Sequence, residues 1–190
     1  MDGHFIWLNE PEVHRGDAAD LHVTTGAKTD FWQETFYGFA RDNGHAYLTL
    51  VEGDFTAHVR FKGDYRELYD QAGLMLRIDA RAWIKTGIEY TDGLMHFSVV
   101  VTNGSSDWSV IPLPDADRDD EVAVRLTRHA SAVRVQFSVN DAPWQLARLA
   151  PFPGTDASVG MMACSPERAG FSANFRGFSL GPAIDRKLHD

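Results

Sequence analysis

Hydrophobic and polar residues alternate with a period of two along most of this chain. Such alternation is typical of strands that bury one face, whereas a surface helix repeats its apolar positions every three to four residues. Glycine, proline, asparagine and aspartate separate the alternating segments, which favours short antiparallel strands. From residue 54 onward we expect strands over residues 54–61, 72–79, 83–90, 94–102, 108–113, 122–129, 132–141, 144–150, 157–165 and 170–180.

The first fifty or so residues are less regular. Strands are expected over residues 5–11, 21–26 and 45–53, and an aromatic-rich connection fills residues 29–44. Long connections inside compact domains are often functional or cover another part of the molecule. Nowhere does a helical period persist, and residues 63–71 offer room for one or two helical turns at most.

About twelve strands in a single chain predict two stacked sheets, because an open sheet of that many twisted strands curls or splits. Asp92 and Gly93 supply the positive φ angles of a tight hairpin turn between two of these strands. Pro112 lacks a ladder donor, so its strand ends there or lies at a sheet edge. Neither a repeat nor a linker divides the chain, which predicts one all-β domain over residues 1–190.

The segment WIKTGIEY, residues 83–90, separates an apolar side from an unusual polar side. Ile84 and Ile88 face one way, and Trp83, Lys85 and Glu89 face the other. If the neighbouring strands form a meander, the same face collects further long polar and aromatic side chains. The expected ligand-binding residues are Trp83, Lys85, Glu89, Gln71, Arg77, His58 and Trp108, with Trp32 and Tyr37 at the rim.

Aromatic rings stack on the C–H faces of sugars while charged and amide groups bind hydroxyls, so this face fits a carbohydrate. A plainer interpretation also stays open, in which the long side chains only cover the outside of a sheet and Trp83 packs under a loop. For the aromatic connection we expect Phe31, Phe36 and Phe39 to plug one end of the sandwich.

Composition narrows the partners and the location. With 18 basic and 27 acidic residues the formal charge is −9, which disfavours phosphate backbones and anionic membranes. Hydrophobic residues make up 44% of the chain, enough to form a full core without stabilising disulfides or metal ions. Cys164 is the single cysteine, so no internal disulfide can form. The opening residues lack a secretory signal and the apolar runs are too short for a membrane helix, so we expect a cytoplasmic protein.

Two stretches, YDQAGLMLRIDARAWIKTGIEY and SVVVTNGSSDWS, resemble the core signature of a domain-of-unknown-function family in the concanavalin A-like lectin/glucanase superfamily. One branch of that family is named for a regulator of enolase. The closing SVGMMACSPERAGFSANFRGFSL is similar to the last strands of those sandwiches and to the C-terminal sandwich of some β-xylosidases. The resemblance covers roughly residues 28 to 180. It implies a jelly-roll sandwich of two antiparallel sheets, one of them concave, and informs the fold more than the function.

An enzymatic role requires two suitably spaced carboxylates. Glu89 is the candidate acid, with Asp70 or Asp79 as its partner, but the Glu-x-Asp-x-(x)-Glu strand of sandwich glucanases is missing from the sequence. Asp92 lies three residues from Glu89 and therefore on the opposite face of the strand. Glu89 could instead pair with Lys85 or Arg77.

Metal and cofactor chemistry find little support in the sequence. The eight histidines, from His4 to His189, form no H-x-H or H-E-x-x-H pair. The acidic loop at residues 115–121 reads as a solvated turn, with a cation site as the alternative. Cys164 ends a buried strand and is expected to be a packed thiol. We expect neither a metal nor a cofactor.

The sequence therefore predicts non-catalytic recognition of a carbohydrate or sugar-like small molecule on the concave sheet. Two alternatives stay open. The first is a glycoside hydrolase or lyase that uses Glu89, and the second is a protein-interaction module in metabolic regulation that receives a partner on the same face.

Overall fold

The computed structural model describes residues 4–188, which form an all-β sandwich. Within this range the structure contains sixteen strands and no helix. More strands are present than the expected twelve, because the irregular N-terminal part contributes short additional ones. The strands are β1 (Phe5–Leu8), β2 (Val13–Gly16), β3 (Asp20–Thr24), β4 (Phe31–Gln33), β5 (Ala40–Asp42), β6 (His45–Val51), β7 (Phe55–Gly63), β8 (Gln71–Asp79), β9 (Ala82–Thr91), β10 (Leu94–Asn103), β11 (Ser105–Pro112), β12 (Val122–His129), β13 (Ala132–Val139), β14 (Gln145–Pro151), β15 (Ala157–Cys164) and β16 (Ser172–Gly181).

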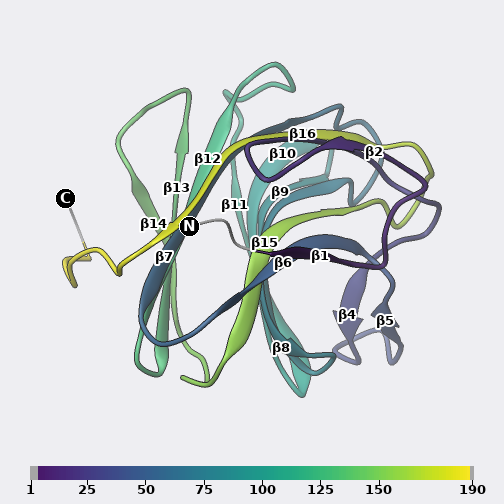
Figure 1. Cartoon of the computed structure of the whole chain (residues 1–190). Coiled ribbons are helices and arrows are strands. Elements are labelled where there is room, and N and C mark those ends of the chain that lie inside the picture. Colours follow the sequence, from purple (N-terminus) through teal and green to yellow (C-terminus); the bar gives the residue numbers. More distant parts are fainter. Residues whose placement is uncertain (1–3, 189–190) are drawn as a thin grey trace.

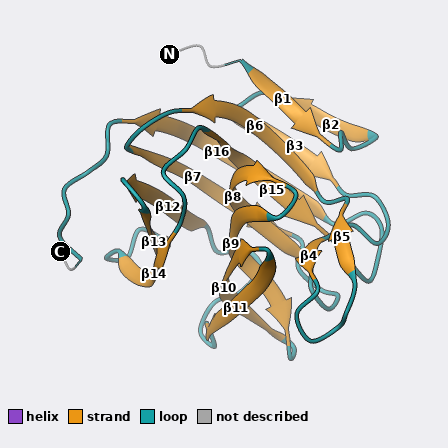
Figure 2. Cartoon of the chain, turned by 90° about the horizontal axis from the view of Figure 1, so that it is seen from below, coloured by secondary structure: helices purple, strands orange, loops and turns teal. Residues whose placement is uncertain are grey.

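Two seven-stranded antiparallel sheets stack on each other (Figure 1). The first, called the pocket sheet below, has the order β1-β6-β15-β8-β9-β10-β11. The second, called the back sheet, has the order β14-β13-β12-β7-β16-β3-β2. The remaining two strands, β4 and β5, form a separate hairpin beside the sandwich (Figure 2). The predicted two-sheet sandwich is thus confirmed.

Alternating side chains fill the space between the two sheets. Ile84 and Ile88 of β9 face this core, as the pattern of residues 83–90 predicted. Across the sandwich, Phe97 of the pocket sheet stacks on Phe137 of the back sheet, with ring centroids 4.2 Å apart and planes 13° from parallel. Burial of such apolar surface is the main force that holds the layers together.

The turn and edge signals in the sequence also agree with the structure. Asp92 and Gly93 connect β9 to β10 with φ angles of 54° and 76°, as a tight hairpin turn requires. β11 is an edge strand and ends at Pro112. The one or two helical turns allowed within residues 63–71 are absent, since that segment holds only the end of β7, a turn and the start of β8.

A second apolar cluster lies on the outer face of the pocket sheet, beneath the β4–β5 hairpin. It is composed of Phe31, Trp32, Ala46, Leu48, Met75, Trp83, Val100, Met162 and Cys164, with Leu8 at its edge. Because of this cluster, the central strands of the pocket sheet are buried on both faces. Within residues 4–188 we find no helix long and apolar enough to span a bilayer.

Candidate functional site

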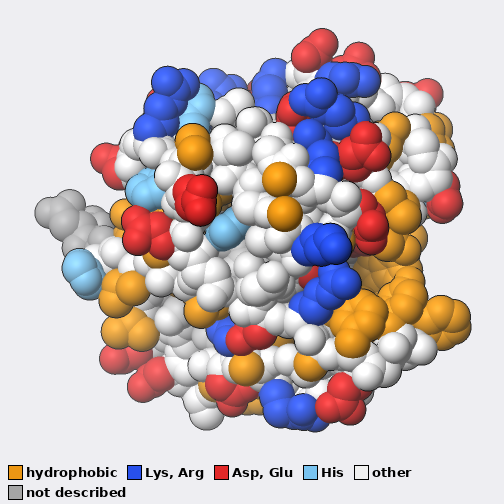
Figure 3. All heavy atoms as spheres, turned by 90° about the vertical axis from the view of Figure 1, so that its right-hand side faces the viewer, with side chains coloured by type: hydrophobic (Ala, Val, Ile, Leu, Met, Phe, Trp, Pro, Cys, Tyr) orange, Lys and Arg blue, Asp and Glu red, His pale blue; other side chains and the backbone are white. Residues whose placement is uncertain are grey.

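A cavity of about 260 Å³ opens on the outer face of the pocket sheet, between the sheet and the β4–β5 hairpin. Its floor comes from β8 and β9, one wall from the hairpin, and the opposite wall from β11 and the segment before β8. The side of the molecule on which β4 and β5 lie in Figure 1 faces the viewer in Figure 3, where hydrophobic side chains gather at the lower right.

Strand register places the floor residues. Lys85 and Glu89 alternate along β9, and Gln71 of β8 pairs directly opposite Glu89. These three polar side chains are only 4–5% exposed. Gly87 lies between Lys85 and Glu89 and opposite Gly73 of β8, so the centre of the floor carries no side chain. A Cβ on either glycine would lie 2.0 Å from a backbone oxygen of the paired strand, so glycine is needed for β8 and β9 to approach closely between the polar groups.

Asp30, from the segment before β4, joins this floor. Its Oδ1 atom accepts a hydrogen bond of 2.8 Å from Lys85 Nζ and another of 2.8 Å from the backbone N–H of Phe31. Burial lowers the pKa of Lys85, but the charges of Asp30, Cys164 and Glu89 and the hydrogen bond to Asp30 together outweigh burial and raise the pKa. Lys85 therefore stays protonated inside the cavity.

Glu89 has no such partner. Ser98 Oγ donates a hydrogen bond of 2.7 Å to Glu89 Oε2, and Trp108 Nε1 donates one of 3.1 Å to Ser98 Oγ. Burial raises the pKa of Glu89, against the opposing effects of Lys85 and Ser98. Among the residues that the structure describes, no lysine, arginine or histidine forms an ion pair with this carboxylate.

Four aromatic rings enclose the cavity in a closed circuit of contacts. Trp32 contacts Tyr37 and Trp108 with ring centroids 5.8 and 6.4 Å apart, and Tyr69 contacts Trp108 at 6.3 Å. The hydroxyls of Tyr37 and Tyr69, 3.4 Å apart, complete the circuit. The hydrogen bond with Tyr37 and burial raise the pKa of Tyr69 to about 12. We call Trp32, Tyr37, Tyr69 and Trp108 the aromatic collar.

The backbone at Tyr69 is strained. Its φ angle of 64° is in the left-handed region, which bulky residues rarely adopt. A hydrogen bond of 2.7 Å from Tyr69 N to the carbonyl of Tyr90 holds the residue there. Backbone strain of this kind is tolerated at positions where a side chain must be held in a particular orientation. Here it places the Tyr69 ring so that it completes the collar.

Six of the nine expected ligand-binding residues meet in this cavity: Trp32, Tyr37, Gln71, Lys85, Glu89 and Trp108. The lining also includes residues that the sequence analysis did not select, among them Asp30, Tyr69 and the rim residue Arg41. Asp30 precedes the buried Phe31 in the aromatic connection, but no pattern links it to Lys85, 55 positions away. The contact between Asp30 and Lys85 forms only because the β4–β5 hairpin folds back over the pocket sheet.

Trp83 does not line the cavity, so the expectation of an exposed stacking platform is wrong. Its side chain is fully buried beneath Phe31, with centroids 6.2 Å apart, and Trp83 Nε1 donates to the carbonyl of Ala80. Trp83 packs under the hairpin, as the plainer interpretation held. Arg77 shares the outer face but lies outside the cavity, because it forms two hydrogen bonds of 2.8 Å with Asp42.

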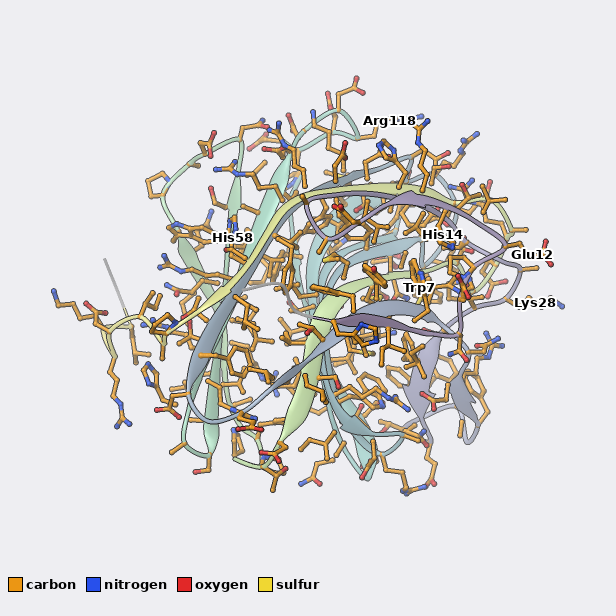
Figure 4. The ribbon with its side chains drawn as sticks, viewed as in Figure 1. Trp7, Glu12, His14, Lys28, His58 and Arg118 are labelled. Carbon is orange, nitrogen blue, oxygen red and sulfur yellow. The ribbon has the colours of Figure 1, made fainter. Side chains whose placement is uncertain are left out.

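The expectation that His58 joins this face is also wrong. β7 belongs to the back sheet, where His58 is labelled in Figure 4. Its neighbours Ala57 and Val59 face the core, so His58 faces away from it, and its ring lies 5.8 Å from that of Trp144. The meander from β8 to β11 exists as expected, but the chain crosses from one sheet to the other between β7 and β8. The alternation of residues correctly placed His58 on the face of β7 that is turned away from the core. It could not show to which of the two sheets β7 belongs.

The expected partner acids for Glu89 are elsewhere. Asp70 is buried in an ion pair with Arg168, whose Nη2 lies 2.7 Å from its carboxylate. Asp79 is exposed at a turn, where it accepts a hydrogen bond from the N–H of Arg81. Glu89 forms no ion pair with Lys85 or Arg77, since these pair with Asp30 and Asp42. The second carboxylate on the floor of the cavity is Asp30.

The hydrophobic plug is only partly as expected. Phe31 is fully buried, which confirms its role, whereas Phe36 at the hairpin tip is 94% exposed and Phe39 is 37% exposed. The backbone of Phe36 adopts a φ of 63° that turns its ring outward. Phe39 lines the cavity and lies under the guanidinium of Arg41 at 4.7 Å.

Acidic side chains of the loop at residues 115–121 pair with other residues of the protein. Glu121 pairs with Arg60 and Arg176, and Asp120 accepts a hydrogen bond from Asn140. Across residues 4–188, no three His, Cys, Asp or Glu side chains gather as a metal site would require; His189 lies outside the described residues. Cys164 is buried beneath the hairpin, and burial raises the pKa of its thiol well above its usual range.

Comparison with known proteins identifies the family to which the chain is related. The model of the family described as "Protein of unknown function (DUF1349)" matches residues 7–183. The chain is 46% identical over 185 residues to a Saccharomyces cerevisiae protein named "Regulation of enolase protein 1", covering 97% of this chain and 92% of that protein.

Solved structures share the fold. A functionally unknown protein from Saccharomyces cerevisiae superposes with a TM-score of 0.90 at 44% identity, over 95% of this chain and 97% of that one. A xylan β-1,4-xylosidase from Bacillus halodurans C-125 gives a TM-score of 0.66 at 15% identity, over 85% of this chain and 32% of the enzyme. The metal-free lectin I-B4 from Griffonia simplicifolia gives 0.59 at 12% identity, over 95% of this chain and 93% of the lectin. The last two likenesses concern the sandwich fold alone.

Proposed function

This chain belongs to the DUF1349 family, and from the geometry of its cavity we propose that it binds a carbohydrate or sugar-like small molecule without catalysis. The observation that carries this proposal is the aromatic collar above a buried polar floor. Rings of the collar can cover the C–H faces of a ligand, and the floor can bind its hydroxyls.

The floor has hydrogen-bonding capacity that the protein leaves unused. The side-chain amide of Gln71, although buried, forms no hydrogen bond with any described residue. Gln71 lines the cavity, so its amide can offer both a donor and an acceptor to a molecule bound there. A ligand with several hydroxyls would supply the missing partner.

The cavity volume limits the size of the ligand. At about 260 Å³ it lies just below the roughly 300–1,000 Å³ typical of sites for drug-sized molecules. One sugar ring with its substituents fits this description better than an extended oligosaccharide. A longer ligand would have to continue past the hairpin.

Calorimetric titration with a panel of monosaccharides tests the proposal. We expect at least one to bind, and we expect Gln71→Ala and Trp108→Ala each to weaken that binding at least tenfold. Trp144→Ala is the matched control, because Trp144 packs against Arg125 and His58 of the back sheet. Folded protein that binds no sugar, or a Trp108→Ala variant that binds as well as wild type, would refute the proposal.

A hydrolase or lyase is the second candidate, and the state of Glu89 favours it. Burial raises the pKa of Glu89, a property that suits a general acid. Against this role, the other carboxylate of the cavity, Asp30, is held by Lys85 and by the N–H of Phe31. Turnover of aryl glycosides that disappears in Glu89→Gln, with binding retained, would establish this candidate in place of the first.

A protein-interaction module is the third candidate. The exposed ring of Phe36 at the hairpin tip favours it, as does the name of the yeast relative, which refers to regulation of enolase. Loss of a captured partner on Phe36→Ala, with sugar binding unchanged, would assign the hairpin tip to that role. The same result would keep the cavity as the binding site of the sugar-like ligand.

A further inference from the structure

The floor of the cavity holds two acids and one base. Asp30 and Lys85 form one buried ion pair at 2.8 Å, which accounts for one positive and one negative charge. Glu89 is left over, and it is as deeply buried as Lys85. A buried carboxylate is normally paired with a cation, because removal of an isolated charge from water is strongly unfavourable. Lys85 also acts on Glu89 through its charge, but one base serves two acids, so the ionised floor carries one excess negative charge.

Two carboxylates that line the cavity have an oxygen that could receive such a cation. Glu89 Oε2 accepts from Ser98, while Glu89 Oε1 has no hydrogen-bond partner among the described residues. Asp30 uses only Oδ1 in its contacts with Lys85 and Phe31, which leaves Oδ2 open. Together with the unpartnered amide of Gln71, these atoms form a set of acceptors that the protein itself does not fill.

The aromatic collar has the arrangement that a cation favours. The ring planes of Trp32 and Trp108 are 86° apart, those of Tyr69 and Trp108 are 79° apart, and those of Trp32 and Tyr37 are 67° apart. Near-perpendicular rings form the sides of a box rather than one flat platform. The negative faces of such rings attract ammonium groups, most strongly where water is excluded.

The other charges around the cavity agree with this arrangement. Glu167 adds an acid at the rim and Arg41 a base, so the lining carries three acidic and two basic side chains. The formal charge of the chain, −9, also attracts cations and repels anions such as sugar phosphates.

We propose that the cavity selects ligands with a protonated amine, and that the sugar-like molecule it binds is an amino sugar whose ammonium group lies between Glu89 and the aromatic collar. The inference rests on the proposed function, since it specifies the ligand of the same site. Trp108 contributes twice, because its ring belongs to the collar and its N–H orients Ser98, which in turn holds Glu89.

The test compares glucosamine with glucose and N-acetylglucosamine, which lack the positive charge. Calorimetric titration at pH 6.5 keeps the amine of glucosamine protonated, since such amines titrate near pH 7.7–8.0. We expect glucosamine to bind at least tenfold more tightly than either neutral sugar. Glu89→Gln should remove this preference while neutral sugars still bind, and Trp144→Ala should leave it intact.

The pH dependence supplies an independent readout. Burial raises the pKa of Glu89, so affinity for glucosamine should rise as the pH increases above the usual range of a glutamate and Glu89 ionises, and affinity for glucose should stay level. The titratable and charged groups around Glu89 are Lys85 on β9, His96 opposite it on β10, Tyr69 before β8, Asp30 and Arg41 on the hairpin side, Cys164 on β15 and Glu167 at the rim. His96 lies opposite Glu89 on β10, so the same rise must persist in His96→Gln and vanish in Glu89→Gln.

Each outcome has a distinct meaning. Equal affinities for glucosamine and the neutral sugars, all lost in Trp108→Ala, would overturn the ammonium inference and leave the proposed function standing. Absence of binding by all three sugars to the folded protein would overturn both. A glucosamine preference that survives Glu89→Gln would also overturn the inference, because the cation would then lie elsewhere.

Discussion

Asp70 and Glu89 are both buried acids, and their surroundings give them opposite roles. Asp70 accepts hydrogen bonds from the guanidinium of Arg168 and from the backbone N–H groups of Arg66 and Glu67. Glu89 accepts from Ser98 and has no ion-pair partner of its own among the described residues. The first is a satisfied structural acid, whereas the second is kept at a cost to stability, as expected of a residue that serves a ligand.

Glu89→Gln is therefore predicted to stabilise the ligand-free protein at neutral pH. Burial raises the pKa of Glu89, so the folded state holds its proton more tightly than the unfolded state. The contribution of Glu89 to stability is then full below its unfolded pKa and declines as the pH rises through its folded pKa. We expect the melting temperature of Glu89→Gln to exceed that of wild type by about 2–4 °C at pH 7, the shift that roughly 1 kcal/mol produces in a domain of this size.

Thermal denaturation at several pH values checks this prediction. The difference between the two proteins should shrink toward pH 4, where Glu89 is protonated in both the folded and the unfolded state. A melting temperature for Glu89→Gln below that of wild type at pH 7 would show that the charged form of Glu89 stabilises the fold.

Asp70→Ala is predicted to do the reverse and destabilise the protein strongly. The substitution removes one partner of a buried ion pair and leaves two backbone N–H groups without acceptors. Loss of one member of such a pair costs about 3–5 kcal/mol. Asp79→Ala is the control, since Asp79 accepts one hydrogen bond at an exposed turn and its loss should cost about 1 kcal/mol. Urea denaturation of both variants measures the contrast, and similar losses would contradict it.

For single residues, the sequence predicts which face of a strand a side chain lies on better than it predicts how deeply that side chain is buried. Alternation within residues 83–90 correctly placed Lys85 and Glu89 on one face and Ile84 and Ile88 on the other. It could not show that Trp83, on the same face as Lys85, is covered by Phe31. Depth depends on which distant segment packs over a strand, and a local period of two contains no information about that.

At the scale of elements, the β4–β5 hairpin decides what the outer face of the pocket sheet becomes. Its base is anchored by Phe31 in the outer apolar cluster and by hydrogen bonds from Gln33 to Ser106 and to the carbonyl of Ala80. Its tip, with Phe36, extends into solvent. The same element thus buries Trp83, delivers Asp30 to Lys85 and supplies Trp32 and Tyr37 to the collar.

Two phenylalanines of this hairpin should respond very differently to truncation. Phe31→Ala removes a fully buried ring and is predicted to cost about 3–5 kcal/mol, as for other large-to-small core changes. Phe36→Ala removes an exposed ring and should change stability by less than about 0.5 kcal/mol. Chemical denaturation of the two variants measures the difference, and a large loss in Phe36→Ala would mean that the tip packs against the domain.

Strands were predictable from sequence wherever one face is buried and the other is polar, as in β7 and β13. The short strands β2, β4 and β5 were not, because each has four residues or fewer, too few for a period to show. The assignment of β7 to the back sheet also escaped prediction, since the crossing before β8 has no signature in local alternation. The error at His58 follows from that crossing.

On the scale of the whole molecule, the pocket sheet is a middle layer. The main core lies between the two sheets, and the outer apolar cluster lies on the opposite face of the pocket sheet under the hairpin. Cys164 belongs to the outer cluster, where its thiol approaches the sulfur of Met162 at 3.6 Å.

The thiol of Cys164 should therefore report the opening of this layer. Burial raises its pKa and excludes reagents, so the native protein should resist alkylation at pH 8 for hours. In denaturant we expect one thiol to react, at the same midpoint as the change in tryptophan fluorescence, if the two apolar layers unfold together. Labelling at a lower denaturant concentration than the fluorescence change would show instead that the hairpin opens independently.

The division of the cavity between a sheet and a hairpin also makes the protein a practical scaffold. Lys85, Glu89 and Gln71 stand on strands fixed by the core, while Tyr37 and Phe39 stand beyond the anchor residues of the hairpin. A library randomised over residues 34–39 would diversify the mouth of the cavity without disturbing the layers beneath it. Selection from such a library could yield binders for new small molecules, much as loop grafting does on an antibody framework.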